Sequence, residues 1–110
     1  MSIFTEIFAK ILGKVKNLVP GANALSDVDL TVELDKLAKG KGLEWKTSVV
    51  DFLKLIGANS SRDNRDALAT ELGVDPSFES GSAKKNEALR KALFKKIAAN
   101  GGKIPASLLD

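Results

Sequence analysis

The chain has 110 residues, a net charge of +3, and neither cysteine nor histidine. A chain of this length buries about 60–70% of its unfolded surface on folding, which allows one domain with its own core. The missing cysteine excludes disulfides and thiolate chemistry, and the missing histidine removes the commonest metal ligand and general base at neutral pH. We therefore expect a protein that is not an enzyme and needs no cofactor.

Residues 1–19 are predicted to form an amphipathic helix, because apolar side chains recur there at helical spacing. The apolar face comprises Ile3, Phe4, Ile7, Phe8, Ile11, Leu12, Val15, Leu18 and Val19. Such a face can dock in a partner's groove, lie on an anionic membrane, pack on its own domain or pair with a second copy of the chain, and amphipathicity alone leaves these four open. The candidate contact residues for a protein partner or a membrane surface are Ile3, Phe4, Ile7, Phe8 and Ile11.

The same segment bears on location. Glu6 and Lys10 interrupt its apolar residues and no base precedes them, which is not typical of a secretory signal. No stretch of the chain approaches the roughly 18 apolar residues of a membrane span. We expect a cytoplasmic protein.

Residues 20–26 are small or helix-stopping and are predicted to be a flexible linker to a helical domain of residues 27–110. The first helix of that domain is expected to be capped by Asp27 or Asp29 and to stop at the glycines of residues 40–42. Its predicted core positions are Leu30, Leu34, Leu37 and Ala38.

Two short helices are predicted in residues 45–57 and 60–73, each with a polar cap, an apolar stripe and a final glycine. In the first, Ser48 or Thr47 is expected to accept a hydrogen bond from a free backbone N–H. Trp45, the only tryptophan, is expected to fill the core at the entry of this helix.

The second of these helices is expected to be capped by Ser60, with Asp63 three residues later. The pair resembles a helix-turn-helix, the motif that places its second helix in a DNA groove. Acids in that second helix would repel phosphates and argue against nucleic-acid binding there. They are Asp63, Asp66 and Glu71.

A turn-rich loop is predicted at residues 74–81, in which Phe78 is expected to fill the core. Ser82 is then expected to cap the longest helix, of about 17 residues by the usual stop signals. Apolar residues within 104–110 are expected to fold back onto the bundle.

The C-terminal part is the most basic, with seven Lys or Arg against two acids in residues 81–110. Basic charge at one end can steer anionic partners or be paired internally. The candidate contact residues there are Lys84, Lys91 and Lys95. Weak nucleic-acid binding through this helix is the alternative function, although no aromatic residues alternate with its bases as single-strand binding favours.

Three pairs of acids were considered for hydrolytic chemistry, which needs two carboxylates. They are Asp27/Asp29, Asp63/Asp66 and Asp75/Glu79. All stand where caps and turns favour Asp, and none has the ligand spacing of a calcium loop. No catalytic or metal site is predicted.

Several stretches are similar to a known family. They are Met1-Ser2-Ile3-Phe4, Leu43 with Trp45 to Leu55, Ser60-Ser61 with Arg65, Leu68 to Gly73, and Asn100 to Asp110. With these the chain resembles the small bacterial family called domain of unknown function 3597. The resemblance implies a short helical body behind a linker and an amphipathic N-terminal segment, and it brings no established catalytic residues.

The sequence therefore predicts an all-α protein, a four-helix body with short loops and a tethered N-terminal helix. Its predicted function is that of a helical interaction module whose N-terminal helix contacts a protein partner or a membrane surface, with self-association through that helix as a further possibility.

Overall fold

The structure, a computed structural model, describes residues 2–18, 29–100, 104 and 108. Its helices are α1 (Ile3–Leu18), α2 (Leu30–Ala38), α3 (Val49–Leu55), α4 (Arg62–Glu71) and α5 (Ala83–Ala99). The described residues contain no strand, and the predicted all-α fold is confirmed. The predicted linker, residues 20–26, lies outside the described residues. Within the part of the chain that the structure covers, no helix is long and apolar enough to cross a membrane.

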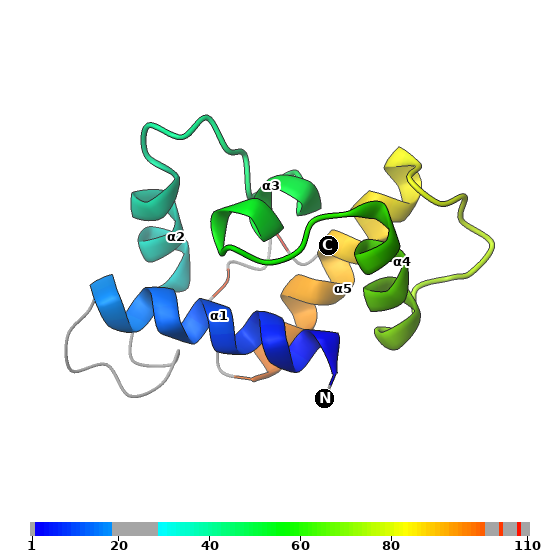
Figure 1. Ribbon diagram of the computed structural model, residues 1–110, viewed down its shortest axis with the longest axis horizontal. Coiled ribbons are helices and arrows are strands. Elements are labelled where there is room, and N and C mark those ends of the chain that lie inside the picture. Colours follow the sequence, from blue (N-terminus) through cyan, green and yellow to red (C-terminus); the bar gives the residue numbers. More distant parts are fainter. Residues whose placement is uncertain (1, 19–28, 101–103, 105–107, 109–110) are drawn as a thin grey trace.

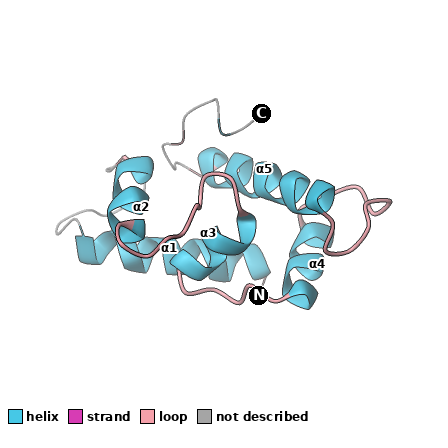
Figure 2. Cartoon of the chain, turned by 90° about the horizontal axis from the view of Figure 1, so that it is seen from above, coloured by secondary structure: helices cyan, strands magenta, loops and turns pink. Residues whose placement is uncertain are grey.

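The helices pack in a closed ring. α1 contacts α2 and α4, α2 contacts α3, α3 contacts α5, and α5 contacts α4. In Figure 1, α2 and α4 stand at opposite ends of α1, and in Figure 2 α3 overlaps α1 while α5 runs to one side of both. Each helix therefore buries its apolar stripe toward one shared core.

Three aromatic residues form the centre of this core. Trp45, Phe52 and Phe94 are each at most 2% exposed. The Phe52 and Phe94 rings lie edge to face with their centroids 5.2 Å apart, and Trp45 lies 6.0 Å from Phe94. The Trp45 indole N–H donates to Asp35 at 3.0 Å, so its one polar group is satisfied at the edge of the core. Trp45 fills the core as predicted.

Helix α1 belongs to the same core. Phe4, Ile7, Ile11 and Val15 are buried among the core residues of the other helices. Of the four ways to cover this apolar face that the sequence leaves open, the structure shows packing on the domain itself.

A carboxylate from α4 closes the N-terminus of α1. The two oxygens of Glu71 accept hydrogen bonds from the backbone N–H groups of Ile3 and Phe4, both at 2.8 Å. The first N–H groups of a helix have no partner within the helix, and a negative charge is favourable beside them. Glu71 thus binds Ile3 and Phe4, which precede it by 68 and 67 positions in the sequence.

Helix caps follow the sequence signals with one exception. Asp29, Ser48 and Ser82 cap α2, α3 and α5, each accepting from backbone N–H groups two or three residues later, as predicted. The cap of α4 is Ser61, whose hydroxyl accepts from Asn64 N at 3.3 Å. The prediction of Ser60 was wrong by one residue, because α4 begins at Arg62 and Ser61 takes the extended N-cap conformation immediately before it. The Ser60 carbonyl accepts a hydrogen bond from the Arg65 guanidinium.

This difference gives a direct test. A Ser61→Ala variant is expected to lose about 1 kcal/mol of unfolding free energy, the usual effect of removing a serine cap. Ser60→Ala is expected to lose less than half of that, since its hydrogen bond uses the main chain. Urea denaturation of both variants measures the difference, and equal losses would contradict the assignment of the cap.

The C-terminal segment is described at two residues. Ile104 and Leu108 are partly buried and pack against the core, as predicted for residues 104–110. The guanidinium of Arg90 donates to the Leu108 carbonyl at 3.3 Å. The other residues of the predicted return, apart from these two, lie outside the described part of the chain.

Candidate functional site

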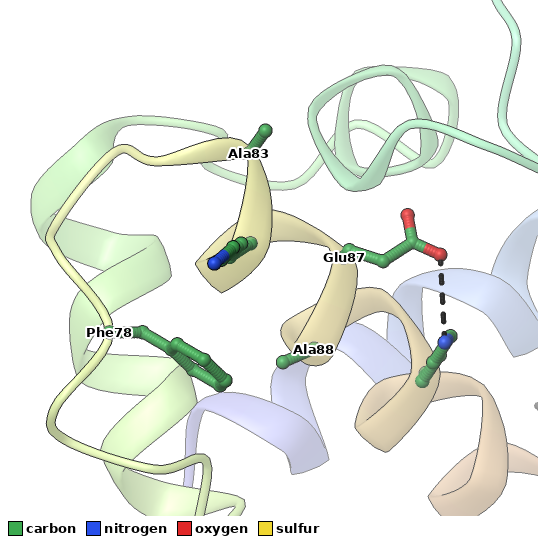
Figure 3. Close-up of a pocket in the computed structure, with 6 residues that line it drawn as sticks. Phe78, Ala83, Glu87 and Ala88 are labelled. Atoms are coloured by element: carbon green, nitrogen blue, oxygen red, sulfur yellow. Dashed lines mark ion pairs between the residues drawn. The ribbon is translucent and has the colours of Figure 1, made fainter.

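A hollow on the surface lies between α5 and the loop that joins it to α4. We call it the α5 groove; it has a volume of about 540 Å³ and is lined by Phe78, Ala83, Lys84, Glu87, Ala88 and Lys91. Figure 3 shows the Phe78 ring extending from the loop toward Ala88, with Glu87 on the other flank of the helix. One wall is aromatic, the floor is made of small side chains, and the rim is charged.

Phe78 corrects a prediction. It was expected to fill the core, but it is half-buried and lies outside the core cluster. The core is already filled by Trp45, Phe52 and Phe94, and the loop carries Phe78 to the outer side of α5 instead. An aromatic side chain therefore remains available at the surface.

The loop that carries Phe78 is held to both helices by Asp66 of α4. This carboxylate accepts from the Ser80 hydroxyl and forms an ion pair with Lys85 of α5 at 3.0 Å. The hydrogen bond from Ser80, then that from Lys85, lowers the pKa of Asp66 below its ordinary value of 3.8. At neutral pH Asp66 is therefore a charged anchor for the end of the loop.

Gly81 adds a steric constraint at the same place. A Cβ atom at this position would lie 2.8 Å from Nε of Arg62, closer than side chains tolerate. The exposed Arg62 guanidinium thus lies directly on the loop backbone at Gly81.

The other end of the loop is a turn built on Asp75. Its side chain accepts from Ser77 N at 2.9 Å, and its carbonyl accepts from Phe78 N at 3.3 Å. The hydrogen bonds from Ser77 lower the pKa of Asp75 below 3.8. This local turn sets the direction in which the Phe78 backbone leaves it.

The charges on the rim are unequal. The Glu87 carboxylate is bound by the largely buried guanidinium of Arg90, and this hydrogen bond is the main reason that the pKa of Glu87 is lowered. Lys91 reaches Glu87 only at 4.0 Å, and Lys84 forms no ion pair with any described residue. Because the positive charge of Arg90 offsets the negative charge of Glu87, Lys84 and Lys91 give the groove a net positive charge.

The carboxylates around the loop predict a pH dependence. Because the pKa of Asp66 is lower in the folded state, its contribution to stability is fully present above 3.8 and is lost as the pH falls through the folded-state value. Ser80→Ala removes the largest cause of the shift, so the Asp66 pKa is expected to rise toward 3.8. Titration of the Asp66 carboxyl ¹³C resonance in both proteins measures this, and an unchanged midpoint would contradict the hydrogen bond.

The residues predicted as contacts fall into two groups. Lys84 and Lys91 line the groove, whereas Lys95 is exposed on α5 beyond it. The α1 residues lie in the core or partly buried against it: Phe4, Ile7 and Ile11 are buried, and Ile3 and Phe8 are partly buried. Phe78 is the groove residue that the sequence assigned to another role. Its surrounding turn residues, Asp75-Pro76-Ser77, were the available signal for a surface position.

No metal-binding cluster of three His, Cys, Asp or Glu side chains occurs among the described residues. The carboxylates of Asp66, Asp75 and Glu87 are each engaged by a donor of this chain. The arrangement can bind a ligand that has both an apolar part and negative charges. The apolar part would pack against Phe78 and the alanines, and the negative charges would pair with the lysines.

Comparison with known proteins gives two matches to the chain. A family model with the description "Domain of unknown function (DUF3597)" matches residues 14–105. The solution structure of a conserved unknown protein from Rhodopseudomonas palustris is 35% identical, covers 98% of each chain and superposes with a TM-score of 0.73. No curated protein matches the sequence. The family model covers most of the chain and a structure at this identity shares the fold, so the protein belongs to the family described as Domain of unknown function (DUF3597).

Proposed function

We propose that the protein is a non-enzymatic interaction module that binds a partner protein through the α5 groove. The observation that carries the proposal is the partly buried Phe78 ring facing Ala88, with Lys84 and Lys91 in the same lining. Aromatic anchors in a hollow, surrounded by polar residues, contribute a large share of the energy of protein interfaces.

The construction of the loop supports a binding role. Asp66 holds its second half, and the Asp75 turn holds its first half. Phe78 is thereby placed before a partner arrives, which reduces the ordering cost that association must overcome. The volume of about 540 Å³ is within the range of protein ligand sites, about 300–1,000 Å³.

The titratable groups support binding over catalysis. A general acid or base works best when its pKa is close to the operating pH. The pKa values of Asp66, Asp75 and Glu87 are lowered instead, which moves these carboxylates away from that range. The sequence contains no histidine or cysteine to take their place.

The charges of α5 favour a protein partner over nucleic acid, the alternative considered from the sequence. Three cations of this helix are engaged within the protein: Lys85 by Asp66, Arg90 by Glu87, and Lys96 over the Phe4 ring at 4.8 Å. Nucleic-acid affinity depends on many free cations along a backbone. A membrane or partner contact through α1 would require its buried face to leave the core, so the proposal places the contact on α5.

Site-specific photo-cross-linking in cells that produce the protein tests the proposal. Phe78 is replaced by benzoylphenylalanine, and Val32, which is 45% exposed on α2, is replaced in the same way as a control. We expect a cross-linked protein of defined mass from position 78 that is absent from position 32 and is reduced by Lys84→Glu. Products that are the same from both positions, or no product from position 78, would overturn the proposal.

A further inference from the structure

We infer that the segment bound in the α5 groove is an amphipathic helix of a partner protein, with two carboxylates seven residues apart and apolar side chains between them. The inference rests on the proposed function and specifies the chemistry of the partner. It follows from the spacing of the charges, the shape of the floor and the state of Glu87.

The spacing of the groove residues is that of one helix face. Lys84, Ala88 and Lys91 stand at positions i, i+4 and i+7 of α5, so they lie in a row. At about 1.5 Å of rise per residue, the two lysines are separated by about 10 Å along the helix axis. A partner helix lying along α5 meets both lysines if it has acids at its own positions i and i+7.

The floor of the groove determines what lies between those acids. Ala83 and Ala88 are small, and their short side chains leave the hollow between the helix and the Phe78 ring. Apolar side chains at positions i+3 and i+4 of the partner helix would enter this hollow, because they share a face with i and i+7. Their burial against Phe78 supplies the hydrophobic part of the affinity.

The charge on the rim selects acids over bases. Glu87 is the one carboxylate in the lining, and Arg90 already binds it. Lys84 forms no ion pair with a described residue, and Lys91 has only the 4.0 Å contact with Glu87. An anionic lipid or a nucleic acid would also find these lysines, and the test below therefore includes both.

The test uses synthetic helical peptides and the ¹⁵N-labelled full chain. The first peptide has an alanine-rich sequence with Glu, Leu, Leu and Glu at positions i, i+3, i+4 and i+7. The second has the same composition, with both glutamates moved to the opposite face. Calorimetry gives the Kd values, and amide chemical shifts locate the binding. We expect shifts around Phe78 and Lys91, and about fivefold tighter binding of the first peptide, as two exposed ion pairs would provide.

Charge reversal sharpens the test. Lys84→Glu is expected to weaken binding of the first peptide by about tenfold, and exchanging one peptide glutamate for lysine should restore part of the loss. Lys95→Glu makes the same change on the same helix outside the groove and is expected to leave the Kd nearly unchanged. Circular dichroism checks that both variants are folded.

Three results would overturn the inference. They are equal binding of the two peptides, chemical shifts centred away from the groove, and tighter binding of phosphatidylglycerol vesicles or an oligouridine with the same dependence on Lys84. These failures differ from failure of the proposed function: a partner cross-linked at position 78 together with equal peptide affinities would leave the interaction module standing and reject only the acidic helix.

Discussion

Phe52→Ala is expected to lower the free energy of unfolding by about 3–5 kcal/mol, the usual loss when a buried phenylalanine is truncated. Phe52 is 1% exposed and its ring packs against both Trp45 and Phe94. The truncation leaves a cavity that the packed helices α3 and α5 can only partly close. A domain of this size has about 5–15 kcal/mol of stability in total, so the variant should lose a large share of it.

Urea denaturation followed by Trp45 fluorescence measures the loss, because the indole lies beside the altered position. Val32→Ala is the control, because it also shortens an apolar side chain but at a position that is 45% exposed. We expect it to change the free energy of unfolding by less than about 0.5 kcal/mol. A loss of less than 1 kcal/mol for Phe52→Ala would show that the aromatic cluster is not the centre of the core.

The second large effect is expected at Glu71. Glu71→Ala removes both acceptors from the first N–H groups of α1 and should cost about 1–2 kcal/mol, as for other helix caps with a charged acceptor. Glu71→Gln keeps one neutral acceptor and should cost less. Because the bonds join α1 to α4, hydrogen exchange is expected to accelerate at the start of α1 while the amides of α5 stay protected.

Glu44→Gln provides the matched control, since Glu44 is an exposed glutamate whose side chain makes no hydrogen bond with a described residue. It should leave both the unfolding free energy and the exchange of α1 unchanged. If Glu71→Ala behaves like this control, or if exchange accelerates equally in all helices, the carboxylate does not act as a local link between α1 and α4.

Local signals in the sequence were sufficient for most of the helices. Ser82 was assigned as a cap, and Ser48 was one of two candidates with Thr47, because a cap depends only on residues two or three positions away. The same reasoning could not separate Ser60 from Ser61, since two adjacent serines offer the same hydroxyl. The start of α4 at Arg62, with Ser61 in the extended conformation before it, decides between them, and that depends on the geometry of the turn.

Features that depend on tertiary contacts were harder to predict. Phe78 reads as a core residue by hydrophobicity, although the turn residues before it indicated a surface position. The contact of Asp66 with Ser80, which holds the loop there, depends on tertiary structure. Glu71 is an ordinary polar residue at the end of a helix until α1 is placed beside it. Lys84 and Lys91 were named as candidates and line the groove, whereas the aromatic wall formed by Phe78 was not predicted.

The link between Glu71 and the start of α1 also has a consequence for synthesis of the chain. Helix α1 is translated before α4, and the residue that closes its N-terminus follows some 68 residues later. At about 5–20 residues per second, the ribosome needs several seconds to reach that point. During this interval the apolar face of α1 has none of its later partners from α4 and α5 to cover it. We therefore expect the nascent chain, and not the finished protein, to be the form that engages chaperones through Phe4, Ile7 and Ile11.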